Sequence, residues 1–136
     1  MRHVVLDTNA LIQALPTRSY YHKIWTDFLA GTYCLCVSNE ILTEYEEILA
    51  VYASPEVARN VVNAIACHPK TIYRESYFRF RLLSHIDKDD DKFVDCAITA
   101  GADYIVTEDS HFDYLKQIPF PQLNVLTLDE FNDLLK

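Results

Sequence analysis

The chain has 136 residues, half of them hydrophobic, and a net charge of −8. This length and composition are typical of one compact domain and exclude a disordered polar chain. A domain that binds nucleic acid through phosphate contacts alone should be basic, and this chain is not. The protein therefore either avoids nucleic acid or places metal cations between its own carboxylates and the phosphates.

The N-terminal part of the chain predicts a strand, a helix and a second strand. Residues 3–6 form a short, almost wholly apolar run, which is typical of a buried parallel strand. Residues 19–30 repeat large apolar side chains at helical spacing, and Gly31 supplies a stop signal. Residues 33–37 form another apolar run and predict the next buried strand.

Two helices are expected next. Ser38 or Asn39 caps a helix that runs to about Tyr52. The sequence Ser54-Pro55-Glu56 starts a second helix, with proline in its first turn, and this helix closes before Pro69.

The central segment from residue 71 to 83 has a mixed pattern. Aromatic residues alternate with arginine from Tyr77 to Leu82, which favours a strand. A helix then begins near Asp90 and ends at Gly101. Residues 103–107 predict a further strand.

The C-terminal part completes the alternation of strands and helices. Residues 111–116 predict a short helix and residues 124–126 a last strand, and Thr127-x-x-Glu130 is a capping box that opens the final helix. Strands that alternate with helices indicate a mostly parallel sheet with helices on both faces. We therefore expect one α/β domain over residues 1–136.

The N-terminus and the cysteines favour a cytoplasmic protein that does not contact a membrane. No apolar run approaches the roughly 20 residues that span a bilayer, and the run from Val4 to Leu6 is too short for a signal peptide. The four cysteines fit reduced core thiols, because their spacing matches no usual zinc motif. They are Cys34, Cys36, Cys67 and Cys96.

Several acidic residues fall where a parallel sheet collects its ligands. Asp7 follows the first strand, Asp109 lies two residues past the strand at 103–107, and Asp90 and Asp91 open a helix. Taken singly, each is also explained as a turn or helix-cap residue. Together at one edge they would repel one another unless Mg²⁺ or Mn²⁺, which prefer hard oxygen ligands, lay between them.

Glu44 is a fifth candidate, from the middle of a predicted helix. It shares a helical stripe with Ile41 and Ile48. An acid on an apolar stripe is costly unless a cation neutralises it. That cation is either a metal ion or the partner in a structural salt bridge with Arg or Lys.

Four motifs in this order resemble those of the PIN-domain family, over essentially the whole chain from Arg2 to about Leu128. The chain is most similar to the branch of toxin components of toxin–antitoxin systems, which is related to VapC-type toxins. The motifs are Val-Leu-Asp7-Thr-Asn, Ser-Asn-Glu-Ile-Leu-Thr-Glu44-Tyr, Asp-Asp-Asp91-Lys-Phe-Val-Asp-Cys-Ala and Ala-Asp-Tyr-Ile-Val-Thr-Glu-Asp109. The resemblance implies an α/β/α sandwich and a ribonuclease that depends on Mg²⁺ or Mn²⁺.

The resemblance also implies which residues form the site. Its metal-binding and catalytic acids fall on Asp7, Glu44, Asp90 and Asp109, and Asn9 and Thr107 match supporting polar positions. The helix pattern selects Asp90, whereas counting back from Asp109 selects Asp91 as the ligand. Asp95, one turn beyond Asp91, is a further ligand or a supporting group.

The implied partners are an RNA substrate, an antitoxin protein and a second copy of the chain in a homodimer. Candidate RNA-contacting cations are Arg18, Lys23, Arg79 and Arg81, although solvated surface charge also explains each. A second hypothesis is a protein of the same fold that binds metal or RNA without cutting it. A phosphatase is disfavoured, because Asn9 stands where the Asp-x-Asp motif needs its second acid.

Overall fold

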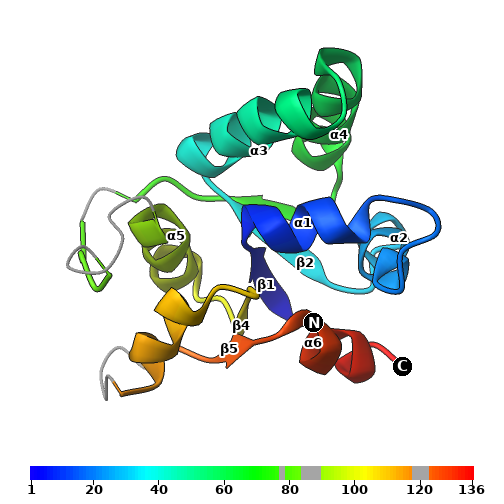
Figure 1. Cartoon of the computed structure of the whole chain (residues 1–136). Helices are drawn as coiled ribbons and strands as arrows, with labels where there is room; N and C mark the ends of the chain where they lie inside the picture. Colours follow the sequence, from blue (N-terminus) through cyan, green and yellow to red (C-terminus); the bar gives the residue numbers. More distant parts are fainter. Residues whose placement is uncertain (77–78, 84–89, 118–122) are drawn as a thin grey trace.

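A five-stranded parallel sheet forms the centre of the molecule (Figure 1). The computed structural model describes residues 1–76, 79–83, 90–117 and 123–136. The strand order is β3-β2-β1-β4-β5, and all four neighbouring pairs are parallel. The strands are β1 (His3–Leu6), β2 (Cys34–Val37), β3 (Thr71–Tyr73), β4 (Tyr104–Val106) and β5 (Val125–Leu126).

Helices cover both faces of this sheet, which confirms the predicted three-layer α/β/α class. Helix α5 lies on one side, α1, α2 and α6 lie on the other, and α3 and α4 pack together toward the β3 edge (Figure 1). The helices are α1 (Thr8–Ala14), α2 (His22–Leu29), α3 (Asn39–Tyr52), α4 (Pro55–Cys67), α5 (Asp91–Ala100), the 3₁₀ helix η2 (Ser110–Gln117) and α6 (Leu128–Leu134). Among the described residues, none of these helices is long and apolar enough to cross a membrane.

The predicted helix signals act in the structure as caps. The Ser38 hydroxyl accepts a hydrogen bond from the Ile41 backbone N–H and so caps α3. Thr127 and Glu130 form the complete capping box of α6. Gly101 ends α5 with φ of 64°, in the left-handed region that glycine adopts without a Cβ clash.

Two parts of the chain differ from the prediction. Helix α1 was missed, because its seven residues follow β1 directly and are too few to show a clear period. The predicted strand from Tyr77 to Leu82 is wrong for residues 79–82, which are not in a strand. Residues 77–78 lie outside the described part. The backbone N–H groups of Phe80 and Leu83 donate to side-chain carboxylates.

Strand β1 is the buried centre of the sheet and is also tied to α3. Val4, Val5 and Leu6 are almost fully buried. The buried Tyr45 side chain on α3 reaches across, and its hydroxyl donates to the Leu6 carbonyl oxygen at 2.6 Å. This bond fixes the position of α3 relative to the end of β1.

Replacing Tyr45 by Phe tests this tie. The substitution keeps the ring but leaves the Leu6 carbonyl without this donor, so we expect the free energy of unfolding to fall by about 1 kcal/mol. Urea denaturation measures the change. Tyr52→Phe, on the exposed end of the same helix, should leave stability unaltered; equal effects of the two substitutions would show that the bond does not stabilise the fold.

Candidate metal site

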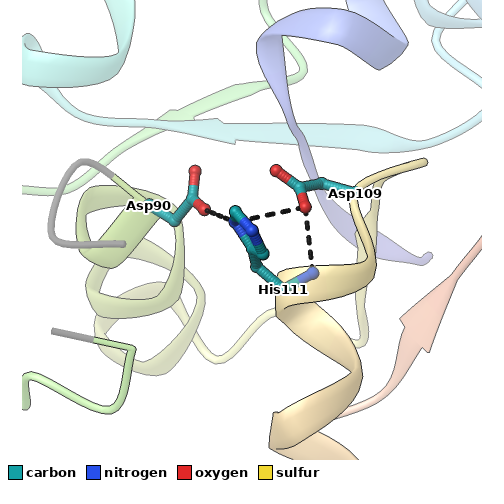
Figure 2. Close-up of side chains that lie close together, drawn as sticks. All are labelled: Asp90, Asp109 and His111. Atoms are coloured by element: carbon teal, nitrogen blue, oxygen red, sulfur yellow. Dashed lines mark hydrogen bonds and ion pairs between the residues drawn. The ribbon is translucent and has the colours of Figure 1, made fainter. Parts of the chain in front are cut away.

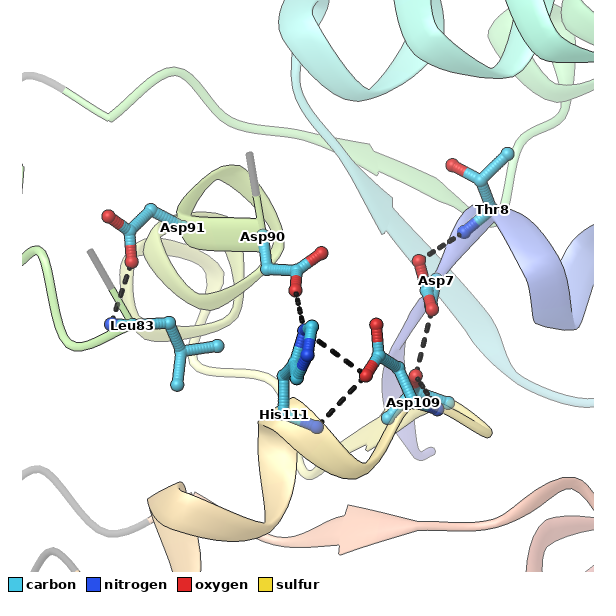
Figure 3. Close-up of polar contacts among 8 residues, drawn as sticks. Asp7, Thr8, Leu83, Asp90, Asp91, Asp109 and His111 are labelled. Carbon is cyan, nitrogen blue, oxygen red and sulfur yellow. Dashed lines mark hydrogen bonds and ion pairs between the residues drawn. The ribbon is translucent and has the colours of Figure 1, made fainter. Parts of the chain in front are cut away.

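Asp7 stands at the carboxyl end of β1, where the sheet register places it beside Thr107. Leu6 pairs with Val106, and the Asp7 backbone N–H donates to the Val106 carbonyl at 3.0 Å. The Thr107 hydroxyl then donates to Asp7 Oδ2 at 2.8 Å, and the Thr8 backbone N–H donates to Asp7 Oδ1 at 2.7 Å (Figure 3). Asp7 is only 6% exposed, so these two bonds hold a nearly buried carboxylate in one orientation.

Asp109 is oriented by the same threonine. Its backbone N–H donates to Thr107 Oγ1 at 3.0 Å, and its Oδ1 accepts a hydrogen bond from the His111 backbone N–H at 2.9 Å. Thr107 therefore links Asp7 and Asp109, the acids that follow β1 and β4. The supporting role of Thr107 in a metal site stays a prediction.

Asp90, Asp109 and His111 form a compact group of possible metal ligands. His111 Nδ1 lies 3.3 Å from Asp90 Oδ2 and 3.3 Å from Asp109 Oδ1 (Figure 2). One ligand atom from each residue lies within 4.8 Å of the others. The imidazole thus sits between two carboxylates that come from α5 and from the segment after β4.

The two other acids of α5 have different neighbours. Asp91 Oδ1 accepts a hydrogen bond from the Leu83 backbone N–H at 2.8 Å, and Asp95 Oδ1 accepts one from the Phe80 backbone N–H at 3.1 Å. Asp91 points toward Leu83, whereas Asp90 points toward His111 (Figure 3). Of the three acids considered from the sequence, Asp90 is the one that the structure brings to Asp109.

Glu44 is joined to Asp7 through Thr8. The Thr8 hydroxyl donates to Glu44 Oε2, while the Thr8 backbone N–H donates to Asp7. Glu44 Oε1 also forms a 2.9 Å ion pair with Lys92 Nζ from α5. The salt bridge that the sequence left open as an alternative is therefore present.

The apolar stripe from which Glu44 was predicted does not coincide with the buried face of α3. The buried face of α3 consists of Ile41, Tyr45 and Leu49, and Glu44 lies half-buried at its edge. An acid at the edge of a core can keep its charge with one cationic partner, so burial alone does not require a metal ion.

Three residues of the site were not selected from the sequence. Thr8, Lys92 and His111 contact the candidate acids. Only their neighbourhood could have indicated them, because each lies within two residues of a predicted ligand. Asn9 is exposed in the first turn of α1.

The acids crowd one another electrostatically. Burial raises the pKa of Asp7 above its usual value, and the charges of Glu44 and Asp109 raise it further, against the lowering effect of the hydrogen bonds from Thr107 and Thr8. The carboxylate oxygens at this edge of the parallel sheet suit hard cations such as Mg²⁺ or Mn²⁺, whereas an imidazole nitrogen is a better ligand for softer transition metals. The residues present therefore fit a divalent cation.

The fold and the site together define a parallel α/β/α protein with a cluster of acidic residues at the carboxyl ends of its strands. The family model of the PIN domain matches residues 3–111. The chain therefore belongs to the PIN-domain family.

A solved structure gives the same fold. The crystal structure of VapBC2 from Rickettsia felis, bound to a DNA fragment from its promoter, aligns with a TM-score of 0.62 over 92% of this chain and 98% of the other. The sequence identity is 16%, so the likeness concerns the fold alone. No protein with curated annotation shows significant sequence similarity to the chain.

The raised pKa of Asp7 predicts how the metal-free protein responds to pH. Its folded-state pKa lies above the unfolded value, so the penalty is present at neutral pH and disappears as pH falls below both values. In EDTA, Asp7→Asn should therefore raise the melting temperature at pH 7, on the order of a few degrees. The difference from wild type should shrink toward pH 4.

Thermal melts from pH 4 to 8 measure this difference. The exposed acid Asp113 provides the control, and Asp113→Asn should follow the wild-type curve. A metal-free Asp7→Asn protein that is less stable than wild type at pH 7 would contradict the electrostatic account.

Proposed function

We propose that this protein is a metal-dependent endoribonuclease that uses Mg²⁺ or Mn²⁺ to hydrolyse phosphodiester bonds in RNA. PIN domains are generally nucleases, and the chain belongs to that family. The observation that carries the proposal is the placement of Asp7, Asp90 and Asp109, from three separate segments, around one side of the sheet edge.

Each residue of the site would have its own role in metal binding and hydrolysis. Asp7, Asp90 and Asp109 would hold the cation, and Glu44 would complete the acidic surface. A bound divalent ion supplies Lewis-acid chemistry, lowering the pKa of a water molecule and stabilising the leaving oxygen. Thr107 orients the carboxylate of Asp7 and the backbone of Asp109. A carboxylate of the site would accept the proton of the attacking water.

The negative charge of the protein is consistent with this proposal. Burial, together with the charges of neighbouring Glu44 and Asp109, raises the pKa of Asp7, so a cation would stabilise the ionised carboxylate. A cation held there would in turn attract a phosphate that the bare acids repel. RNA binding at the site would therefore depend on metal.

A second candidate is a non-catalytic PIN-domain protein that binds metal or RNA. Lys92 and His111 favour it, because they place nitrogen groups beside Glu44, Asp90 and Asp109 within the chain itself. In such a protein, Lys92 and His111 would pair with the carboxylates, and the site would not cleave RNA.

We further propose that the enzyme is the toxin of a toxin–antitoxin pair. Its likeness in fold to VapBC2 supports this role. The proposal includes an antitoxin protein as partner, a homodimer as the assembly, and action in the cytoplasm, where cellular RNA is found.

Metal binding and cleavage should depend together on Asp7. We expect Mn²⁺ to raise the melting temperature of the wild type and to support cleavage of RNA, and Asp7→Asn to abolish both, because it removes a charged ligand from the buried position. Asp113→Asn should retain both. Cleavage that persists unchanged in Asp7→Asn and in EDTA would sink the nuclease assignment, whereas a Mn²⁺ shift without cleavage would favour the binding protein.

The toxin role predicts a phenotype. Induced expression of the wild type should arrest bacterial growth within a few generations, and Asp109→Asn should relieve the arrest because it removes an acid of the site. Colony counts after induction, with immunoblots to match protein levels, measure the effect. Equal toxicity of the wild type and Asp109→Asn would argue against RNA cleavage as its cause.

A further inference from the structure

An arginine-rich stretch lies between β3 and α5 in the sequence. Residues 74–81 read Arg-Glu-Ser-Tyr-Phe-Arg-Phe-Arg, with three arginines and three aromatic residues against one acid. Arginine interleaved with aromatic side chains is typical of surfaces that bind single-stranded nucleic acid. The proposed function leaves this stretch unexplained.

Two buried carboxylates of α5 accept hydrogen bonds from the backbone of residues 79–83. The Phe80 backbone N–H donates to Asp95 at 3.1 Å, and the Leu83 backbone N–H donates to Asp91 at 2.8 Å. Asp95 is 2% exposed and Asp91 8%. We call residues 79–83 the strap. Its Arg81 has φ of 56° and lies between the two anchored residues.

The strap turns its polar and aromatic side chains outward. Phe80 is 40% exposed, and the side chains of Arg79 and Arg81 on either side of it are exposed too. A half-exposed aromatic ring offers a stacking face to a base, and the flanking guanidinium groups can contact phosphates.

The strap also lies next to the elements that carry the site acids. Arg79 forms a 2.6 Å ion pair with Glu40 in the first turn of α3, one turn before Glu44. Asp91, which anchors Leu83, is the residue after Asp90. An exposed ion pair contributes little stability, so Arg79 can exchange Glu40 for a phosphate at low cost.

We propose that the strap is a binding surface for single-stranded RNA beside the acidic site. Arg79 and Arg81 contact phosphates, and Phe80 stacks on a base. Asp91 and Asp95 are positioning residues that hold the strap. The inference rests on the proposed function only for the choice of RNA as ligand, and binding to the strap itself needs no metal.

Binding in EDTA tests the strap separately from catalysis. The probe is a short fluorescein-labelled single-stranded oligoribonucleotide, and anisotropy gives its affinity across a salt series. Arg79→Ala and Arg81→Ala should each weaken binding and reduce the slope of log K against log salt by about 0.7. Phe80→Ala should weaken binding about fivefold or more with the slope unchanged.

Matched controls come from elsewhere on the surface. Arg59→Ala and Tyr52→Ala remove exposed side chains of the same types from α4 and α3 and should leave affinity unchanged. Equal binding by the wild type and all three strap variants, or no RNA binding by the wild type, would overturn the proposal. If the wild type binds RNA through the strap but cuts no RNA, the strap proposal holds and the nuclease assignment fails.

Removing the competing acid should act in the opposite direction. Glu40→Gln releases Arg79, so we expect RNA affinity to rise about twofold or more. Glu47→Gln removes the same charge from an exposed position on α3 that lines one groove together with Glu40, and should have a smaller effect. An equal rise in both variants would assign the gain to overall charge and contradict the role of Arg79.

Two substitutions of Asp95 test whether this residue positions the strap. Asp95→Ala should weaken RNA binding, whereas Asp95→Asn, which keeps an oxygen to accept the Phe80 N–H, should restore it. Both should retain the wild-type Mn²⁺ shift in melting temperature. Loss of that shift in Asp95→Asn would make Asp95 a metal ligand and overturn its positioning role; if Asp95→Ala does not fold, Arg81→Ala and Asp95→Asn still decide.

Discussion

The parallel pairing of β1 with β4 is the constraint on which the site depends. Because Leu6 is level with Val106, Asp7 and Thr107 emerge side by side, and the threonine hydroxyl can bond to the aspartate. A slip of one residue would turn Asp7 to the opposite face of the sheet. The core residues Val4 to Leu6 prevent such a slip, since it would carry their apolar side chains out of the positions that bury them.

The clustered acids lower the stability of the folded state, and contacts from neighbouring side chains offset part of this effect. Burial and the charges of Glu44 and Asp109 raise the pKa of Asp7, while Thr8 and Thr107 stabilise its ionised form. Lys92 neutralises Glu44, and the His111 ring lies between Asp90 and Asp109. These contacts offset part of the repulsion among the acids and leave the carboxylate oxygens at the sheet edge, where we propose that they bind a cation.

Much of this arrangement is predictable from the sequence, because the buried strands and the caps at Ser38, Gly101 and Thr127 are local signals. The acids after strands follow from sheet topology. The ion pair of Glu44 and Lys92 is not predictable in this way, since it joins residues 48 positions apart. Nor is the choice between Asp90 and Asp91, because neighbouring residues at a helix start point in different directions and periodicity locates a helix end only to within one or two residues.

The same limit explains the error at residues 79–82, where alternation predicted a strand but the backbone bonds to Asp95 and Asp91. Asp90, Asp91 and Asp95 thus have separate partners, and we propose that Asp90 belongs to the metal centre. Anomalous diffraction from a crystal soaked in Mn²⁺ tests this most directly. The account predicts a peak within bonding distance of Asp7, Asp90 and Asp109; a peak on Asp91 or Asp95, or none at the ends of β1 and β4, would contradict it.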